Sequence, residues 1–169
     1  MDALSRLNEG SAADSRAELL RCCGSSRWAE AMTARRPFHD PEALLASADA
    51  LWWGLGESDW REAFGHHPKI GDAAALRARF ASTRQWAAGE QAGVQSATEE
   101  TLVALAQGNR AYEDRFGFIF IVCATGKTAE EMLARLRARL PNDPKDEVRV
   151  AAGEQARITR IRLEKLLAS

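Results

Sequence analysis

One long apolar run, FGFIFIVCA at residues 116–124, stands out in a sequence that is otherwise patterned for helices. Taken alone, such a run predicts a buried β-strand. The sequence holds no second β-like run with which it could pair, and an isolated strand leaves its backbone N–H and C=O groups unsatisfied. We therefore predict an all-α fold in which these residues form a short extended segment or an irregular helix. The free backbone groups of this segment are then available to helix ends, water or a ligand.

Capping residues and prolines mark the beginnings of helices along most of the chain. Asp40 followed by Pro41 is an N-cap with proline at the first helical position, and the helix it opens is expected to stop at Gly56. Further helix starts are expected at Ser11, at Ser25 or Ser26, at Ser58 or Asp59, in capping boxes beginning at Ser96 and Thr128, and at Asp143 with Pro144. Weaker patterns predict a helix or surface loop over 72–81 and a helix over 83–95. Together these signals predict roughly eight helices in one compact domain, residues 1–169.

The composition excludes several classes of protein. A formal net charge of -1 gives no overall field that would favour nucleic acid or an anionic membrane surface as a partner. No apolar stretch is long enough to span a bilayer, and the start of the chain does not have the pattern of a signal peptide. The three cysteines include the adjacent pair Cys22 and Cys23, which is a poor disulfide framework and suits a reducing compartment. No spacing typical of structural zinc is present, so we expect a cytoplasmic protein without a metal.

The dipeptide His67-Pro68 is the sharpest local candidate for a functional site. Pro68 restricts the backbone of His67 to an extended conformation, so the imidazole can be held at a defined angle. The structural alternative is an imidazole at a helix end that is hydrogen-bonded to a carbonyl. His66 fits the role of a C-terminal cap of the preceding helix, and a metal site made of His66 and His67 is not expected, because neighbouring residues rarely converge on one ion.

Two further candidates are ambiguous on sequence alone. Glu90 and Gln91 are residue types common on helix surfaces, but Gly89 and Gly93 on either side permit the close approach of a ligand or another backbone. Arg162, between two apolar residues of the last helix, fits either a solvent-facing position or a pocket. The glycine-containing segments lack the strand-to-helix context of a phosphate loop, so nucleotide binding is not expected.

Four stretches of the chain belong together: HHPKIG at 66–71, EQAG at 90–93, NRAYEDRFGFIFIVCATGK at 109–127 and TRIRL at 159–163. With these motifs, the chain resembles the 2-oxo-4-hydroxy-4-carboxy-5-ureidoimidazoline (OHCU) decarboxylase family over nearly its whole length. The resemblance implies a small all-α enzyme, a homodimer, that needs neither a metal nor an organic cofactor. It implies decarboxylation of OHCU to (S)-allantoin and CO2 in urate degradation, a step of purine catabolism.

The resemblance also implies roles for particular residues. His67 and Glu90 match the family's catalytic positions. Substrate binding is implied for Pro68, Ala87, Gln91, Arg162 and the run Phe120, Ile121, Val122, Cys123 and Ala124. Ala87 departs from the family, which often has serine there, and the missing hydroxyl removes a hydrogen bond worth about 0.5–1.5 kcal/mol. This departure bears on affinity more than on activity.

Two alternatives stay open at this point. One is a non-catalytic helical interaction module in which Trp52, Trp53 and Trp60 form a partner-binding face. The other keeps the enzyme but changes its substrate to a related ureido or imidazoline acid, which the Ala87 departure would permit. The pairing of His67 with Glu90 argues against the first alternative, because an interaction module has no use for two proton-handling groups.

Overall fold

The structure of the protein is a computed structural model that describes residues 1–68, 74–76, 78 and 98–169. Every regular element in these residues is an α-helix, so the predicted all-α class is confirmed for this part of the chain. The labelled helices are α1 (Ala3–Glu9), α2 (Ala12–Cys22), α3 (Ser26–Ala34), α4 (Pro41–Trp53), α5 (Glu57–Gly65), α7 (Glu99–Phe116), α8 (Ala129–Arg139) and α9 (Pro144–Leu167). None of these helices combines the length and the apolar character needed to span a membrane.

The contacts of the chain divide it into two compact units. One unit comprises Met1–His67 and Val148–Ser169, and the other comprises Pro68–Glu147. The helix expected over 83–95 lies outside the described residues, as does most of the 72–81 segment, of which residues 74–76 and 78 are helical.

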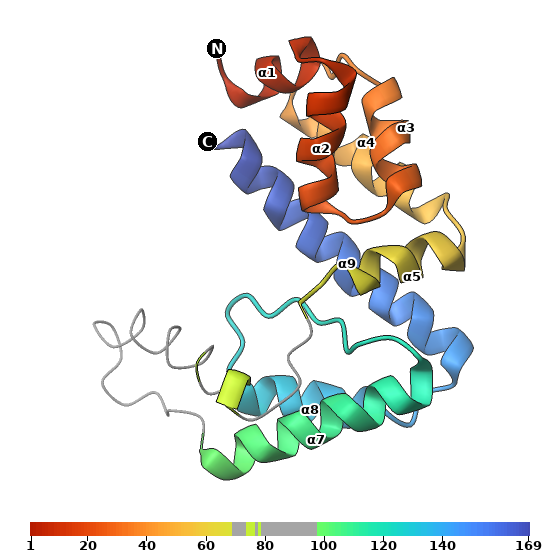
Figure 1. Cartoon of the computed structure of the whole chain (residues 1–169), viewed down its shortest axis with the longest axis vertical. Helices are drawn as coiled ribbons and strands as arrows, with labels where there is room; N and C mark the ends of the chain where they lie inside the picture. The colour runs from red at the N-terminus through yellow and green to blue at the C-terminus, as the bar shows by residue number, and fades with distance from the viewer. Residues whose placement is uncertain (69–73, 77, 79–97) are drawn as a thin grey trace. The chain divides into compact units, whose positions relative to one another are not determined.

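Buried tryptophans hold the helices of the first unit together. The fully buried Trp28 of α3 donates its indole N–H to the carbonyl of Ala48 in α4, at 3.0 Å. Trp52 of α4 donates to the carbonyl of Ala152 in α9, at 2.9 Å, and thereby ties α4 to the last helix. Each such side chain removes about 150–250 Å² from water. The consecutive packing of α2, α3 and α4 can be followed in Figure 1.

The three tryptophans of the proposed partner-binding face do not form an exposed surface. Trp52 is 2% exposed and Trp60 is 5% exposed, and their rings pack with centroids 6.2 Å apart. Trp60 donates its indole N–H to the carbonyl of Trp52 at 3.0 Å, so both polar groups are satisfied inside the unit. Only Trp53 is exposed, at 41%. The alternative of a partner-binding tryptophan face is therefore not supported, since two of its three members belong to the core.

Most predicted helix caps are present in the structure. The Asp40 carboxylate accepts from the Ala43 N–H at 2.7 Å, and the Thr128 hydroxyl accepts from the Glu131 N–H at 3.1 Å. Ser11 and Ser25 cap α2 and α3 in the same way, and Asp143 accepts from the Lys145 N–H at the start of α9. These side chains satisfy N–H groups that a helix leaves unpaired at its start. Each such cap contributes about 0.5–2 kcal/mol to the free energy of unfolding.

Several helix boundaries differ from the sequence prediction, and α5, for example, begins at Glu57 rather than at Ser58 or Asp59. Helix α4 ends at Trp53 with Gly54 as its cap, because the next glycine, Gly56, already serves as the N-cap of α5. Helix α7 begins after Thr98 rather than at the predicted box, and the Thr98 hydroxyl accepts from the Thr101 N–H at 3.1 Å. Helix α1, capped by Asp2, was not predicted.

In the second unit, α7 and α8 pack side by side (Figure 1). Helix α7 ends where Gly117 adopts a left-handed conformation with φ of 79°, which glycine accepts without strain. Residues 119–124 are neither helix nor strand, so the irregular segment expected in place of a strand is confirmed, although Phe116 itself is the last residue of α7. The buried core between these elements contains Leu76, Leu102, Leu105, Ala106, Ala129, Met132, Leu133 and Leu136, with Phe120, Val122 and Ala124 packed against it.

Candidate active site

The corner after α5 fixes the position of His67. His66 is the C-cap of α5, as predicted, and the backbone N–H of His67 donates to the carbonyl of Phe64 at 3.3 Å. The ring of His67 is half-buried, and its Nε2 lies 2.5 Å from Oε1 of Gln155 in α9. The partner is thus a side-chain amide rather than the backbone carbonyl of the structural alternative. A backbone contact to α5 and a ring contact to α9 therefore hold His67 in place.

Arg162 lies two turns beyond Gln155 on α9 and is half-buried rather than solvent-facing. Its Nη1 lies 3.5 Å from the carbonyl of Cys22, the last residue of α2. The carbonyls at the end of a helix carry partial negative charge and lack partners in the helix, so a guanidinium is favourable there. This contact uses one of the five N–H donors of the guanidinium.

Helices α2, α5 and α9 enclose a pocket of about 290 Å³ in the first unit. It brings together two predicted site residues that lie far apart in the sequence, His67 and Arg162. No acidic side chain lines it among the described residues, although Arg21 on its rim lies 3.7 Å from Glu18. Its lining residues are Leu20, Arg21, Gly24, Ala63, His66, His67 and Arg162. The pocket therefore offers two guanidinium groups and two imidazoles to a ligand, which suits an anion.

Burial lowers the pKa of His67 below the usual value of 6.5, because the charged ring is poorly solvated there. The hydrogen bond to Gln155 acts in the opposite direction, and the nearby Arg162 and His66 lower the pKa further. With its pKa lowered, the imidazole is neutral at pH 7 and can accept a proton. The pocket thus contains a base beside a fixed cation.

The two thiols next to the pocket are not suited to nucleophilic chemistry. Burial raises the pKa of Cys22 and of Cys23 to about 11, although Arg162 acts against this rise in both cases. Because the thiolate is the reactive form, both cysteines stay protonated and unreactive near neutral pH. Neither cysteine is therefore suited to act as a nucleophile in this pocket.

The remaining predicted site residues lie elsewhere in the chain. Ala87, Glu90 and Gln91 are outside the described residues. Pro68 is exposed and begins the second unit, which also contains Phe120, Ile121, Val122, Cys123 and Ala124. Two of the backbone carbonyls that were expected to be free for a ligand are used within this unit: Ile121 accepts from Arg139 at 2.7 Å and Cys123 accepts from Lys127 at 2.6 Å.

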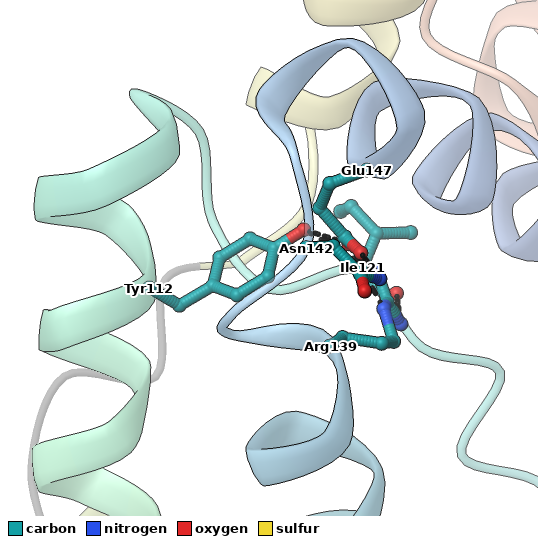
Figure 2. Close-up of polar contacts among 5 residues, drawn as sticks. All are labelled: Tyr112, Ile121, Arg139, Asn142 and Glu147. Atoms are coloured by element: carbon teal, nitrogen blue, oxygen red, sulfur yellow. Dashed lines mark hydrogen bonds and ion pairs between the residues drawn. The ribbon is translucent and has the colours of Figure 1, made fainter.

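A buried polar network supports the irregular segment of the second unit (Figure 2). Arg139, at the end of α8, donates to the carboxylate of Glu147 from Nε at 2.9 Å and from Nη2 at 2.6 Å, and to the carbonyl of Ile121. The hydroxyl of Tyr112 also donates to Glu147, and Asn142 donates to the same carboxylate at 3.1 Å. The guanidinium lies over the Phe120 ring, 4.6 Å from its centroid. This network therefore connects α7, α8 and the start of α9 to the irregular segment, through Phe120 and Ile121.

Comparison with known proteins shows to which family the chain belongs. The family model described as OHCU decarboxylase matches residues 8–164. The chain belongs to the OHCU decarboxylase family. A uric acid degradation bifunctional protein of Arabidopsis thaliana is 37% identical over 145 residues, which are 86% of this chain and 45% of that protein. The mouse 2-oxo-4-hydroxy-4-carboxy-5-ureidoimidazoline decarboxylase is 30% identical over 139 residues, which are 82% of this chain and 78% of the mouse protein.

A solved structure supports membership of the OHCU decarboxylase family. The crystal structure of an OHCU decarboxylase in the presence of (S)-allantoin matches with a TM-score of 0.73 and 35% sequence identity. The match covers 90% of this chain and 98% of that one. The chain spans less than half of the Arabidopsis relative, which is bifunctional by name.

Sequence reasoning missed three residues around the pocket of this OHCU decarboxylase family member: Arg21, Gln155 and Thr159. Gln155 is fully buried, Thr159 is 6% exposed, and Gln155 Nε2 donates to Thr159 Oγ1 at 3.0 Å. The sequence signal for Gln155 and Thr159 is their helical spacing from the buried Ala151 and Leu163, which places both polar residues on the apolar face of α9. Polar residues at core positions usually serve a specific partner. Among the described residues, no group of three or more His, Cys, Asp or Glu is placed to hold a metal.

Gly24→Ala is expected to lower both stability and activity in this OHCU decarboxylase family member. A Cβ at this position would lie 2.5 Å from Cβ and 2.8 Å from Cδ2 of His66, so the His66 ring must move and the adjacent His67 with it. Overpacking of this kind costs about 1–3 kcal/mol. The matched control is Gly65→Ala, where an added Cβ meets nothing within 4 Å. Equal melting temperatures and equal kcat/KM for the two variants would contradict the close-approach role of Gly24.

Proposed function

We propose that this protein decarboxylates OHCU to (S)-allantoin and CO2 without a cofactor, as a step of urate degradation. The observation that carries the proposal is a pocket in which a neutral His67 and the cationic Arg162 and Arg21 occur with no acidic lining residue among those described. The family membership and the named activity of the mouse relative support the same reaction.

Decarboxylation leaves an electron pair on the carbon that loses CO2, and this pair needs an acceptor. In OHCU the acceptor is the imidazoline C=N bond next to the carbon that bears the hydroxyl and the carboxylate. The C–C bond to the carboxylate breaks, its electron pair forms a C=C bond within the ring, and the C=N electrons move to nitrogen, which takes up a proton. The hydroxyl then loses its proton to become a carbonyl, and the neighbouring ring carbon gains one. The protein must bind an anion and move protons.

Arg162 and His67 are assigned these two tasks. The guanidinium of Arg162, anchored on the end of α2, binds an anionic or carbonyl oxygen of the substrate through its planar donors. His67 hydrogen-bonds the hydroxyl or the carboxylate and transfers the hydroxyl proton, for which a neutral ring is required. Keeping the cation fixed before substrate arrives avoids reorganisation during the reaction.

The other residues implied by the family resemblance complete the proposal. Glu90 is assigned to hold ring or ureido N–H groups and to assist stereospecific protonation of the ring carbon. Gln91 and the backbone of residues 120–124 are assigned to the ureido arm, with Pro68 and Ala87 as further substrate contacts. Apolar surroundings favour loss of the negative charge as uncharged CO2.

The pH dependence of kcat/KM is expected to have an acidic limb below pH 6.5. His67 must be neutral to act as a base, and its pKa is lowered from 6.5, so activity persists below that pH and falls only when the ring becomes protonated. Arg162→Gln removes a charge that lowers this pKa, so its limb is expected at higher pH, together with weaker binding. The measurement is a pH profile of both proteins. A limb that stays in place in Arg162→Gln would contradict the electrostatic link between these two residues.

The experiment that tests the proposed function uses OHCU generated in situ from urate. Purified protein is expected to accelerate the decay of the OHCU absorbance in proportion to its concentration. A panel of related ureido and imidazoline acids, assayed in parallel, tests the alternative substrate. Faster turnover of a panel member than of OHCU would replace the substrate assignment, and no acceleration with any compound would overturn the proposed activity.

We also propose that the enzyme is a cytoplasmic homodimer. The buried, protonated cysteines suit a reducing compartment, and the family resemblance implies the dimer. Light scattering after size-exclusion chromatography measures the mass directly, with a dimer expected at twice 18.6 kDa. A monomer at assay concentrations would refute the assignment of oligomeric state.

A further inference from the structure

We propose that Gln155 is a positioning residue that accepts a hydrogen bond from Nε2–H of His67 and thereby presents Nδ1 to the substrate as the basic nitrogen. A neutral imidazole carries one N–H, so the partner of one nitrogen decides which nitrogen has the free lone pair. The role in catalysis rests on the proposed function, whereas the hydrogen-bond arrangement can be tested without turnover.

The ring of His67 contacts the side chain of Gln155 directly. His67 Nε2 lies 2.5 Å from Oε1 of Gln155, a distance at which one of the two atoms must carry a hydrogen. An amide oxygen has no hydrogen, so the ring nitrogen must be the donor. Gln155 is fully buried, so water does not compete for this contact.

The neighbours of Gln155 fix the orientation of its amide, whose oxygen and nitrogen are otherwise hard to tell apart. Gln155 Nε2 donates to the hydroxyl oxygen of Thr159, one turn further along α9, at 3.0 Å. The Thr159 hydroxyl in turn is hydrogen-bonded to the sulfur of Cys23. Because Thr159 Oγ1 accepts from the amide nitrogen, the amide oxygen is turned toward His67. The pair of contacts that Gln155 makes to Thr159 and to His67 thus specifies the tautomer of the ring.

The partner of the ring is a neutral amide rather than a carboxylate, and this difference affects the charge of His67. A carboxylate in this position would pair with the imidazolium and favour the charged ring, which is not a base. The neutral Gln155 fixes the same tautomer while burial and Arg162 keep the ring uncharged. When the ring accepts a proton at Nδ1, the amide oxygen still holds Nε2–H. The arrangement suits a base that must be neutral before each turnover.

Long-range 1H–15N NMR of the unmodified protein, labelled with 15N-histidine, tests the tautomer directly. The chain has three histidines, so the His67 signals are assigned as those missing in His67→Asn. We expect a protonated Nε2 and an unprotonated Nδ1 at pH 7.5. A protonated Nδ1 with an unprotonated Nε2 would overturn the proposal, whether or not the protein decarboxylates OHCU.

Three substitutions test the role in activity. Gln155→Met removes the acceptor at similar size and is expected to lower kcat by about 10–100-fold with little change in KM, as for other partners that orient a functional histidine. Thr159→Val removes only the group that turns the amide and is expected to have a smaller effect in the same direction. Gln155→Glu keeps an acceptor but adds a charge.

The pH profiles of these variants separate a positioning role from a merely structural one. Among the described residues, the charged or titratable groups around the ring are Arg162, His66 and, on the pocket rim, Arg21. These groups are unchanged in the variants, so a shift of the acidic limb reports the change at residue 155. The limb should move to higher pH in Gln155→Glu, because the added carboxylate favours the charged ring. It should move to lower pH in Gln155→Met, because the hydrogen bond that raises the pKa of His67 is lost. Shifts in these opposite directions support the proposal. Unchanged limbs in folded variants would overturn it, and an inactive parent protein with the expected NMR tautomer would overturn the proposed function alone.

Discussion

His67→Asn is expected to lower kcat/KM for OHCU by about 100–10,000-fold, the usual contribution of a positioned acid–base group. Asparagine is similar in size and remains able to hydrogen-bond Gln155, so the corner after α5 should keep its conformation. It has no lone pair of suitable basicity, so the hydroxyl proton of the substrate would have no acceptor. The fall is expected mainly in kcat, because the base acts in the transition state rather than in ground-state binding.

The matched control for this substitution is His39→Asn. His39 is exposed and does not line the pocket, so its replacement should leave kcat and KM unchanged. Circular dichroism and the melting temperature of both variants report whether the fold is retained. Activity of His67→Asn within threefold of the parent, with OHCU as substrate, would refute the assignment of His67 as the base.

The second large effect is expected for Arg139→Met. This substitution leaves the fully buried Glu147 carboxylate without its cation and the Ile121 carbonyl without its donor. Removing one partner of a buried ion pair costs about 3–5 kcal/mol. Total stabilities of single domains are about 5–15 kcal/mol, so the variant should lose a large part of its resistance to urea. The measurement is the midpoint of urea unfolding at constant slope.

An exposed arginine on the same helix provides the control for this loss. Arg137 of α8 is solvent-exposed, and Arg137→Met should change the free energy of unfolding by no more than about 0.5 kcal/mol. Combining Arg139→Met with Glu147→Gln should cost less than the sum of the two single changes, since the second removes the uncompensated charge. A loss for Arg139→Met as small as that for Arg137→Met would mean that the network of Figure 2 does not stabilise the unit.

Local signals were sufficient to predict most of the helices. Asp40 and Thr128 act as caps in the structure because their side chains reach an N–H three residues ahead, a purely local geometry. The end of α4 was misplaced because two glycines, Gly54 and Gly56, lie two residues apart and either can end a helix. The choice depends on the start of α5, where the Gly56 N–H donates to Asp59, and the pattern of α4 alone does not contain that information.

The site was predictable only in part, for the same physical reason. The Pro68 restriction marked His67, but its partner Gln155 is 88 residues away, and only the tertiary fold brings them together. The ion pair of Arg139 and Glu147 was missed because both look like surface residues in an Arg- and Glu-rich stretch. The position of Arg139 could have indicated its burial, because it follows the buried Leu136 by three residues and so lies on the same face of α8.

The optical activity of the product tests the central proposal most directly. The parent protein is added to OHCU formed in situ, and circular dichroism follows the allantoin as it accumulates. The proposal predicts optically active (S)-allantoin, formed faster than by spontaneous decay and at a rate proportional to protein concentration. Racemic allantoin formed at the spontaneous rate would contradict it.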